Sequence, residues 1–299
     1  MKLKQCLPFF ERKFMKKLFL ILAVSILAGC ATPYIDRTYN AVSQDSRAQF
    51  LILHYTAGNF ESSLKTLTQG PVSSHYLVNQ DPPTIYQLVD ETRRAYHAGV
   101  SYWKGATQLN ASSIGIEIVN LGYRDTPEGR TYFDFPQPQI DAVIALVKKI
   151  VKEHSIKPER ILAHSDIAPG RKPDPGPRFP WKQFADAGLI IWPDATAVAQ
   201  RKIGFEQQLP DIVWWQRTLA QHGYAVPQTG APSGAQSSEP NGGQNGESNG
   251  VKRIEMDPAT TSVIASFQMK YRPANFDGKP DAETAAILDV LTSPTVATK

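Results

Sequence analysis

Residues 137–154 constrain the fold most strongly, because they carry one apolar stripe at helical spacing. Six aliphatic side chains recur along this segment: Ile140, Val143, Ile144, Val147, Ile150 and Val151. Residues at this spacing lie on one face of an α-helix, and such a face is normally buried. The pattern therefore predicts a helix over 137–154 that packs its apolar face on a β-sheet.

Three short apolar segments have the length and composition of buried strands. They cover residues 49–54, 113–118 and 160–163. In the second segment the isoleucines point to one side of the strand and Glu117 points to the other, because successive side chains alternate. Two further runs, 74–78 and 84–89, are joined by turn residues and predict a β-hairpin. Together these segments supply the strands of the expected sheet.

Charged and metal-binding side chains lie at the ends of these strands or on a polar strand face. His54 ends the first strand, Glu117 lies within the second, and His164 follows the third, where we expect a loop. Lys172 and Asp174 lie in that loop among three prolines, which restrict the backbone. If the strands are neighbours in one sheet, all five side chains can meet at one edge.

Two histidines and one aspartate would give a metal ion three protein ligands. A tetrahedral zinc ion with three protein ligands keeps one position open, which is the arrangement of a catalytic site. Structural zinc sites usually fill all four positions, mostly with cysteine. The sequence has only Cys6 and Cys30, both near its beginning, so the rest of the chain cannot form a disulfide.

Five motifs, in this order, resemble the zinc-dependent N-acetylmuramoyl-L-alanine amidases, the family related to phage T7 lysozyme and to peptidoglycan recognition proteins. The motifs are Leu53–Thr56, Ser74–Tyr76, Tyr96–Gly99, Ser113–Glu117, and Ala163–His164 with Arg171–Gly176. The resemblance covers roughly residues 45–195. It implies an α/β fold with a central mixed β-sheet flanked by helices, as the catalytic domain over 45–195.

The resemblance also implies the roles of individual residues. His54, His164 and Asp174 would bind one Zn²⁺, Glu117 would act as the general base, and Lys172 would face the developing oxyanion. Four further residues are candidates for substrate contact, with a structural role as the alternative for each: His75, His97, Trp103 and Asn110. Phage relatives place a tyrosine just before the histidine of the second motif, where this chain has Ser74, so a role for that tyrosine does not transfer.

The function implied is zinc-dependent hydrolysis of the amide between N-acetylmuramic acid, or its anhydro form, and L-alanine. The substrates would be peptidoglycan or muropeptides, in cell-wall turnover and recycling. The alternative is a non-catalytic lipoprotein that recognises peptidoglycan, but such relatives typically lack a zinc ligand. A zinc peptidase is a third option, although the sequence lacks the His-Glu-x-x-His signature of such enzymes.

The beginning of the chain has the pattern of a bacterial lipoprotein signal. Lys16 and Lys17 precede an apolar run over 18–27, which is shorter than the ~20 residues that span a bilayer. Leu27-Ala-Gly-Cys30 resembles a lipobox, which predicts a signal peptide over 1–29, a lipid such as palmitate on Cys30, and a tether over 30–44. The alternative is an ordinary cleaved signal. Alanine at position 31, where aspartate would favour the inner membrane, predicts the outer membrane, with the protein facing the periplasm.

Charge gives no sign of a nucleic-acid partner. The net charge is +4, but residues 1–29 hold six basic side chains and one acidic side chain, so the remaining sequence carries about −1. Electrostatic binding of nucleic acid needs a clustered positive surface. With 41% hydrophobic and 20% charged residues the chain has the composition of a globular protein, and we expect a monomer.

The C-terminal third predicts a small domain of three helices. Helical patterns cover 211–222, 260–271 and 281–291, while residues 195–204 are expected to be a linker. Residues 227–250 are rich in Gly, Ser, Asn, Gln and Pro and predict a disordered insertion. Residues 205–292 resemble a peptidoglycan-binding domain of the three-helix type, so peptidoglycan is the expected partner.

Overall fold

The computed structural model describes residues 33–127, 129–228 and 256–293. The signal peptide over 1–29, Cys30 and nearly all of the insertion expected at 227–250 lie outside these residues. Residues 45–299 group as one compact unit, and the preceding residues belong to a separate unit. Within that separate unit, residues 33–44 form neither helix nor strand and are exposed. No helix in the described part of the chain is long and apolar enough to cross a membrane.

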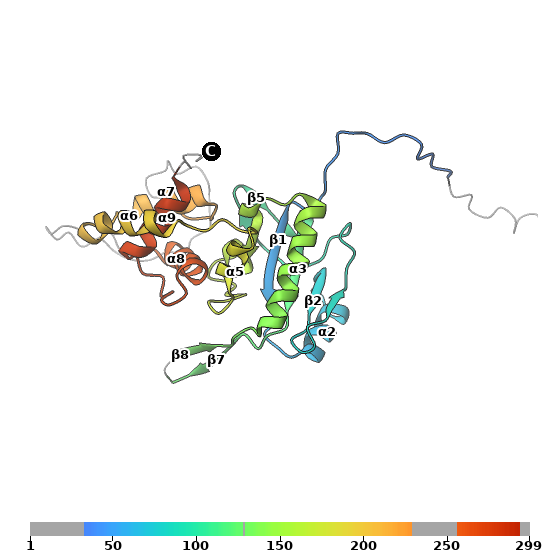
Figure 1. Ribbon diagram of the computed structural model, residues 1–299, viewed down its shortest axis with the longest axis horizontal. Coiled ribbons are helices and arrows are strands. Elements are labelled where there is room, and N and C mark those ends of the chain that lie inside the picture. The colour runs from blue at the N-terminus through green and yellow to red at the C-terminus, as the bar shows by residue number, and fades with distance from the viewer. Residues whose placement is uncertain (1–32, 128, 229–255, 294–299) are drawn as a thin grey trace, which may run out of the picture. The chain divides into compact units, whose positions relative to one another are not determined.

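A five-stranded mixed sheet forms the centre of the compact unit (Figure 1). Its strands are, in spatial order, β3 (Ile85–Gln87), β2 (Tyr76–Val78), β6 (Ser113–Ile118), β1 (Phe50–Tyr55) and β9 (Ile161–Ala163). The last four are parallel, and β3 pairs antiparallel with β2 as the expected hairpin. Parallel strands bring their carboxyl ends to one edge, which is where open α/β sheets bind ligands.

Among the elements between residues 56 and 186 that lie outside the sheet, α3 is the longest. The helices and turns are α2 (Phe60–Gln69), η1 (Leu109–Ala111), α3 (Gln137–His154), η2 (Pro158–Arg160), α4 (His164–Ile167) and α5 (Trp181–Asp186). Two small hairpins lie outside the sheet: β4 (Tyr102–Trp103) with β5 (Ala106–Thr107), and β7 (Tyr123–Thr126) with β8 (Gly129–Tyr132).

Helix α3 covers one face of the sheet, as its apolar stripe predicts. Val143, Val147 and Ile150 from α3 share a buried core with Leu53 of β1 and Ile116 of β6. The helix ends where Ser155 takes a left-handed conformation, with φ of 55°, a common way to end a helix. The α/β fold with a mixed central sheet flanked by helices is thereby confirmed.

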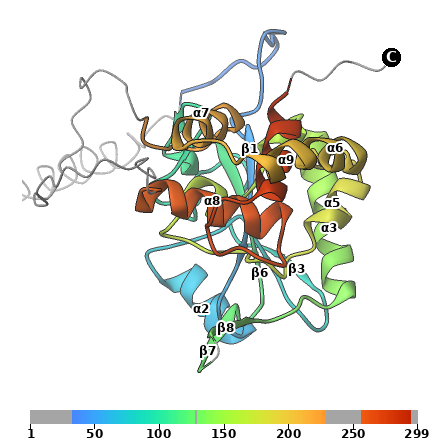
Figure 2. The same ribbon diagram turned by 90° about the vertical axis from the view of Figure 1, so that its left-hand side faces the viewer.

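The opposite face of the sheet packs against part of a group of four helices, which together with the segments that join them we call the helical region. It comprises α6 (Ala195–Gln207), α7 (Ile212–His222), α8 (Pro258–Tyr271) and α9 (Ala282–Thr292). Ile52 of β1 and Leu162 of β9 belong to the same buried cluster as Trp215 and Phe267 of these helices. Figure 2 shows α7, α8 and α9 in front of β1. The helical region therefore shares a core with the sheet.

Aspartate side chains begin the helices of this region. Asp211, Asp257 and Asp281 each accept a hydrogen bond from a backbone N–H in the first turn of α7, α8 and α9. Such caps satisfy donors that have no partner within the helix. These three helices lie where the sequence predicts them.

Residues 195–204 are a helix, which corrects our expectation of a linker. Asp194 caps α6 by accepting a hydrogen bond from the N–H of Ala197, and α6 lies against α9. None of the residues in α6 is fully buried, so the segment lacks the apolar stripe that marks a packed helix. The domain boundary expected between 195 and 205 falls inside one compact unit, and a division into two domains stays a prediction.

Candidate metal centre and cleft

Strand pairing places His54 beside Glu117. His54 is one residue from the end of β1, and in the parallel register its partner on β6 is Glu117. Residues paired in this way in adjacent strands point to the same face of the sheet. The register thus puts a buried imidazole and a carboxylate side by side at the carboxyl edge of the sheet.

His164 opens a short helix, not the loop that we expected. β9 ends at Ala163, and α4 runs over His164–Ile167. The carboxylate of Asp166 reaches back to accept a hydrogen bond from the N–H of Ala163, with Asp166 Oδ2 2.9 Å away. A side chain at this position that binds the N-cap N–H stabilises the beginning of a helix. The turn directs the ring of His164 toward the end of β1.

Three ligand atoms meet between β1, α4 and the loop that follows α4. Nδ1 of His54 lies 2.9 Å from Nδ1 of His164 and 2.9 Å from Oδ2 of Asp174. Nδ1 of His164 lies 3.0 Å from the same oxygen. The three side chains are buried and form a group with the atoms needed to hold a metal ion. Ligands at ~2.0–2.1 Å from a tetrahedral zinc ion would be roughly 3.3 Å apart, so small shifts would admit an ion of this size.

The other nitrogen of each ring is held by an outer partner. Nε2 of His164 donates to the carbonyl oxygen of Ala98 over 3.1 Å, and Nε2 of His54 lies 3.0 Å from Nδ1 of His97. If Nε2 of both ligand rings carries the proton, both Nδ1 lone pairs point at the ligand group. Outer hydrogen bonds of this kind fix the tautomer and orientation of metal-binding histidines.

His97 continues this network toward strand β6. Its Nε2 lies 3.2 Å from Oγ of Ser113, which in turn donates to the carbonyl oxygen of Leu109 over 2.6 Å. The amide oxygen of Asn110 accepts hydrogen bonds from the N–H groups of His97 and Ala98 at 3.0 and 2.7 Å. His54 is therefore oriented by a chain of hydrogen bonds anchored in the backbone.

The protonation states of the ligand group suit a metal ion. Burial, with the neighbouring His164, lowers the pKa of His54 to about 4, so this ring is neutral at pH 7. Burial alone would raise the pKa of Asp174, but His164 and His54 beside it lower that pKa below its usual value. Two imidazoles with an ionised carboxylate form a nitrogen and oxygen ligand set that zinc accepts.

The pKa of Glu117 is shifted in the opposite direction. Burial and the negative charge of Asp174 raise it well above its ordinary value, and only the positive charge of Lys172 opposes the shift. Its Oε2 is buried and has no hydrogen-bond partner within the described residues. A carboxyl group with a raised pKa in a cleft is a candidate general acid or base.

A cleft of about 500 Å³ opens over this group. Its walls include the three candidate ligands, Glu117 and Lys172, together with His97. The structure therefore brings together all five residues that we expected to carry metal binding and catalysis. His97, one of the four expected substrate contacts, also faces the cleft.

The other three expected substrate contacts lie elsewhere. His75 is fully buried, where its Nδ1 accepts from the N–H of Gly115 and its Nε2 lies 3.1 Å from the carbonyl oxygen of Arg93. Asn110 holds the backbone at His97, as described above. Trp103 is buried against the rings of His222 and Tyr224. Each of these positions fits the structural role that was the alternative, and substrate contact at these three residues stays a prediction.

Sequence reasoning also missed residues that shape the site. Ser113 lies on the same strand face as Glu117, as strand alternation predicts, but no sequence pattern indicates its contact with His97. Arg171, in the last of the five motifs, donates to the carbonyl oxygens of Ala98 and Val100 at 2.9 and 2.7 Å. No sequence pattern marks Asp166, because its partners Tyr224 and Lys270 come from distant parts of the chain.

Comparison with known proteins finds similarity to N-acetylmuramoyl-L-alanine amidases. Residues 44–177 match the family described as N-acetylmuramoyl-L-alanine amidase. The amidase AmiD of Escherichia coli K12 is 39% identical over 294 residues, which cover 93% of this chain and 98% of AmiD.

Two solved structures are similar over most of the chain. One is the complex of E. coli AmiD with anhydro-N-acetylmuramic acid-L-Ala-D-γ-Glu-L-Lys, with 40% identity, a TM-score of 0.71, and coverage of 86% of this chain and 93% of that one. The other is AmpDh3 of Pseudomonas aeruginosa in complex with an anhydromuramic pentapeptide, with 37% identity, a TM-score of 0.71, and coverage of 87% and 97%.

Proposed function

Because this chain belongs to the N-acetylmuramoyl-L-alanine amidase family, we propose that it uses zinc to hydrolyse the amide between N-acetylmuramic acid and L-alanine. The anhydro form of the sugar is included, since both similar complexes hold anhydro-muramyl peptides. The observation that carries the proposal is the meeting of His54, His164 and Asp174 beside Glu117 in one cleft.

His54, His164 and Asp174 would hold the zinc ion. Bound zinc polarises a carbonyl group and makes water a nucleophile near neutral pH. The chain's own contribution is orientation, since His97 and the carbonyl oxygen of Ala98 keep both Nδ1 atoms turned toward the ion. Three protein ligands leave a coordination place for the reaction.

Glu117 would move the protons. As a carboxylate in the cleft it accepts a proton from the attacking water, and as an acid it passes that proton to the leaving nitrogen of alanine. Burial and Asp174 raise its pKa, which makes the carboxylate a stronger base than an exposed glutamate. Its Oε2, which has no hydrogen-bond partner among the described residues, leaves an acceptor available for water.

Lys172 would stabilise negative charge. Its side chain lines the same cleft as Glu117 and the ligand group. A fixed cation near the oxygen of the tetrahedral intermediate lowers the barrier, by ~3 kcal/mol if it acts like an oxyanion-hole donor. Pro173 follows it directly and restricts the backbone on that side.

The test is hydrolysis of defined muropeptides. The protein with zinc should release free stem peptide from both N-acetylmuramyl and anhydro-N-acetylmuramyl peptides, and mass spectrometry should place the cut before L-alanine. Glu117→Gln should still bind the muropeptide but release no peptide. If wild type releases nothing under conditions in which E. coli AmiD works, the proposal is wrong. Cleavage at another bond would favour the peptidase alternative.

A peptidoglycan-recognition protein without activity is the second candidate. Binding without hydrolysis needs no complete ligand group, whereas this chain has all three ligands and a buried carboxylate. The Glu117→Gln comparison separates the two functions, because a recognition protein has no hydrolysis to lose.

We also propose that the protein is a monomeric lipoprotein of the outer membrane. The Leu27-Ala-Gly-Cys30 pattern and Ala31 support this location. Labelled palmitate should be incorporated by wild type and not by Cys30→Ala, and fractionation should find only wild type in the outer membrane.

The oligomeric state is tested by light scattering of the protein without its lipid, which should give the mass of a monomer. Binding to isolated sacculi tests the expected peptidoglycan-binding role of residues 205–292.

A further inference from the structure

A buried polar cluster joins the helical region to the short helix that carries His164. We call Asp166, Lys270 and Tyr224 the junction cluster. Nζ of Lys270 on α8 lies 2.8 Å from Oδ2 of Asp166, and the hydroxyl of Tyr224, just after α7, donates to Oδ1 over 2.7 Å. All three residues are buried.

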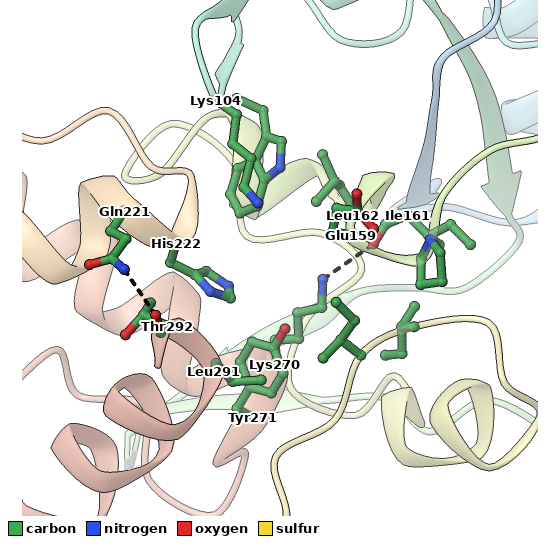
Figure 3. A pocket seen from close by; sticks show the side chains of 14 residues that line it. Lys104, Glu159, Ile161, Leu162, Gln221, His222, Lys270, Tyr271, Leu291 and Thr292 are labelled. Carbon is green, nitrogen blue, oxygen red and sulfur yellow. Dashed lines mark hydrogen bonds between the residues drawn. The ribbon is translucent and has the colours of Figure 1, made fainter. Parts of the chain in front are cut away.

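The carboxylate of Asp166 is the centre of this cluster. Oδ2 also accepts the hydrogen bond from the N–H of Ala163 described above. Lys270 extends from α8 toward β9, where its Nζ lies 3.4 Å from the carbonyl oxygen of Ile161 (Figure 3). Asp166 is thus held by three donors, and two of them come from the helical region.

A second favourable contact holds the ammonium group of Lys270 in this position. Its ammonium also lies 4.4 Å from the centre of the Trp181 ring, whose face favours a cation. The cavity of about 220 Å³ beside it is lined by His222, Tyr271 and Leu162, among others. A buried ammonium and a buried carboxylate each need the other, because either one alone would remain an uncompensated charge.

Helix α4 depends on outside support. It has four residues, which is too short to be stable alone, because forming the first turn of a helix is unfavourable. Asp166 fixes its beginning, and the metal ligand His164 is its first residue. A shift of the carboxylate would therefore move the ring that must meet His54 and Asp174.

We infer that the helical region positions the metal ligand His164, with Lys270 and Tyr224 acting through Asp166. This inference rests on the proposed zinc amidase. Lys270 and Tyr224 do not line the cleft, so they are positioning residues and not catalytic ones. The helical region would then be part of the machinery that holds the metal, in addition to any binding of the cell wall.

The test measures zinc affinity in the full chain. Lys270→Met removes the ammonium but keeps an apolar side chain of similar length, and Tyr224→Phe removes only the hydroxyl. Zinc affinity is measured by competition with a chromophoric chelator, and the environment of the ligands by the absorption spectrum of the Co²⁺-loaded protein. Loss of outer-sphere partners typically weakens metal binding 10- to 100-fold, and we expect this for Lys270→Met, with a smaller loss for Tyr224→Phe.

Arg272→Met is the matched control. Arg272 also lies at the end of α8 and pairs with Asp281 and Glu283 at 3.1 Å, but these partners belong to the helical region. This variant should lose stability without changing the zinc affinity or the Co²⁺ spectrum. The combined Asp166→Asn and Lys270→Met variant should lose less affinity than the sum of the single changes, because both act through one contact.

The outcomes decide the inference separately from the proposed function. If wild type binds no zinc, the proposed function itself fails. If wild type binds zinc and Lys270→Met and Tyr224→Phe bind it equally well, the inference is wrong. It is also wrong if Arg272→Met weakens zinc binding as much as Lys270→Met does. If Lys270→Met does not fold, Tyr224→Phe decides, because losing one hydroxyl leaves the ion pair in place.

Discussion

Gly115 lies directly beneath the ring of His97, so that a Cβ on residue 115 would come within 2.5 Å of Cγ of His97. Because Gly115 has no side chain, the ring of His97 can lie against strand β6. From there His97 reaches His54 at 3.0 Å and Ser113 at 3.2 Å. A glycine in a buried strand weakens the strand unless another group approaches closely, and here that group is an imidazole that orients a candidate ligand.

Gly115→Ala should displace His97 and disturb the ligand group. Overpacking of a filled interior costs ~1–3 kcal/mol, which chemical unfolding would measure. Zinc affinity should also fall about 10-fold, as expected when an outer partner of a ligand is lost. Gly204→Ala is the control, because the residue is in α6 and no neighbouring atom in the described part of the chain lies within 4 Å of a Cβ there. Unchanged zinc affinity in Gly115→Ala would show that His97 does not orient His54.

Asp174→Asn should abolish tight zinc binding while the fold is kept. The change removes the charged ligand atom but keeps the shape of the side chain. The loss should exceed roughly 100-fold, which is the upper end for an outer-sphere partner. Metal analysis after dialysis and a chelator titration measure it. Asp186→Asn, which loses only an ion pair between exposed side chains of Lys182 and Asp186, should bind zinc like wild type.

The metal-free protein should lose stability on acidification between pH 6.5 and about 4. The pKa of His54 is lowered to about 4 by burial and by His164. The unfolded chain therefore takes up a proton in this range and the folded one does not, so falling pH favours unfolding. A shift of this size corresponds to at most ~3 kcal/mol for His54. Burial also lowers the pKa values of His75 and His97, which act in the same direction.

Unfolding by urea at several pH values checks this expectation. His54→Gln should have a shallower loss of stability between pH 6.5 and 4 than wild type. A His54→Gln protein with the same pH dependence as wild type would contradict the neutral, buried state of this imidazole, because the opposing contribution of Glu117 is common to both proteins. Added zinc should steepen the dependence, because protons compete with the metal for the ligands.

The sequence predicted those parts of the fold whose side chains repeat in a pattern. The stripe from Ile140 to Val151 marks α3, and the isoleucines of β6 mark a strand whose other face carries Glu117. Helix α6 has no buried residue, so no periodic signal exists there. The turn at His164 depends on Asp166, whose partners lie about 60 and 100 residues further along the chain, and no local pattern records them.

The candidate site was predictable because its residues follow strands that become neighbours. Function could not be read from residue type alone, as His75 and His97 show. Both are histidines near the same strand, yet His75 binds the backbone of Gly115 and His97 faces the cleft. Trp103 was a candidate for substrate contact, but its ring is buried against the helical region. Which way each side chain points is decided by contacts between distant segments.

Glu117→Gln should make the metal-free protein more stable at pH 7 while removing its activity. Burial and Asp174 raise the pKa of Glu117 well above its ordinary value, so between the pKa of glutamate in the unfolded chain and that of folded Glu117 the folded state holds a proton that the unfolded state has lost. The contribution of Glu117 to stability therefore falls as the pH rises above about 4.5, opposite in sign to that of the buried histidines, and a neutral amide escapes this cost. We expect a gain of about 1 kcal/mol, similar to other stabilising changes at functional sites.

The activity of the wild type should rise with pH, whereas the contribution of Glu117 to stability falls. The carboxylate form is the base, so kcat/KM of the zinc-loaded enzyme should rise as the pH increases through the pKa that Glu117 has beside the bound ion. Urea unfolding of both proteins at pH 4 and pH 7, together with the pH–rate profile of wild type, measures these effects. The stability difference should shrink at pH 4, because Glu117 is then protonated in both states. A Glu117→Gln protein less stable than wild type at pH 7 would mean that the carboxylate is stabilised in the fold and is not poised as a base.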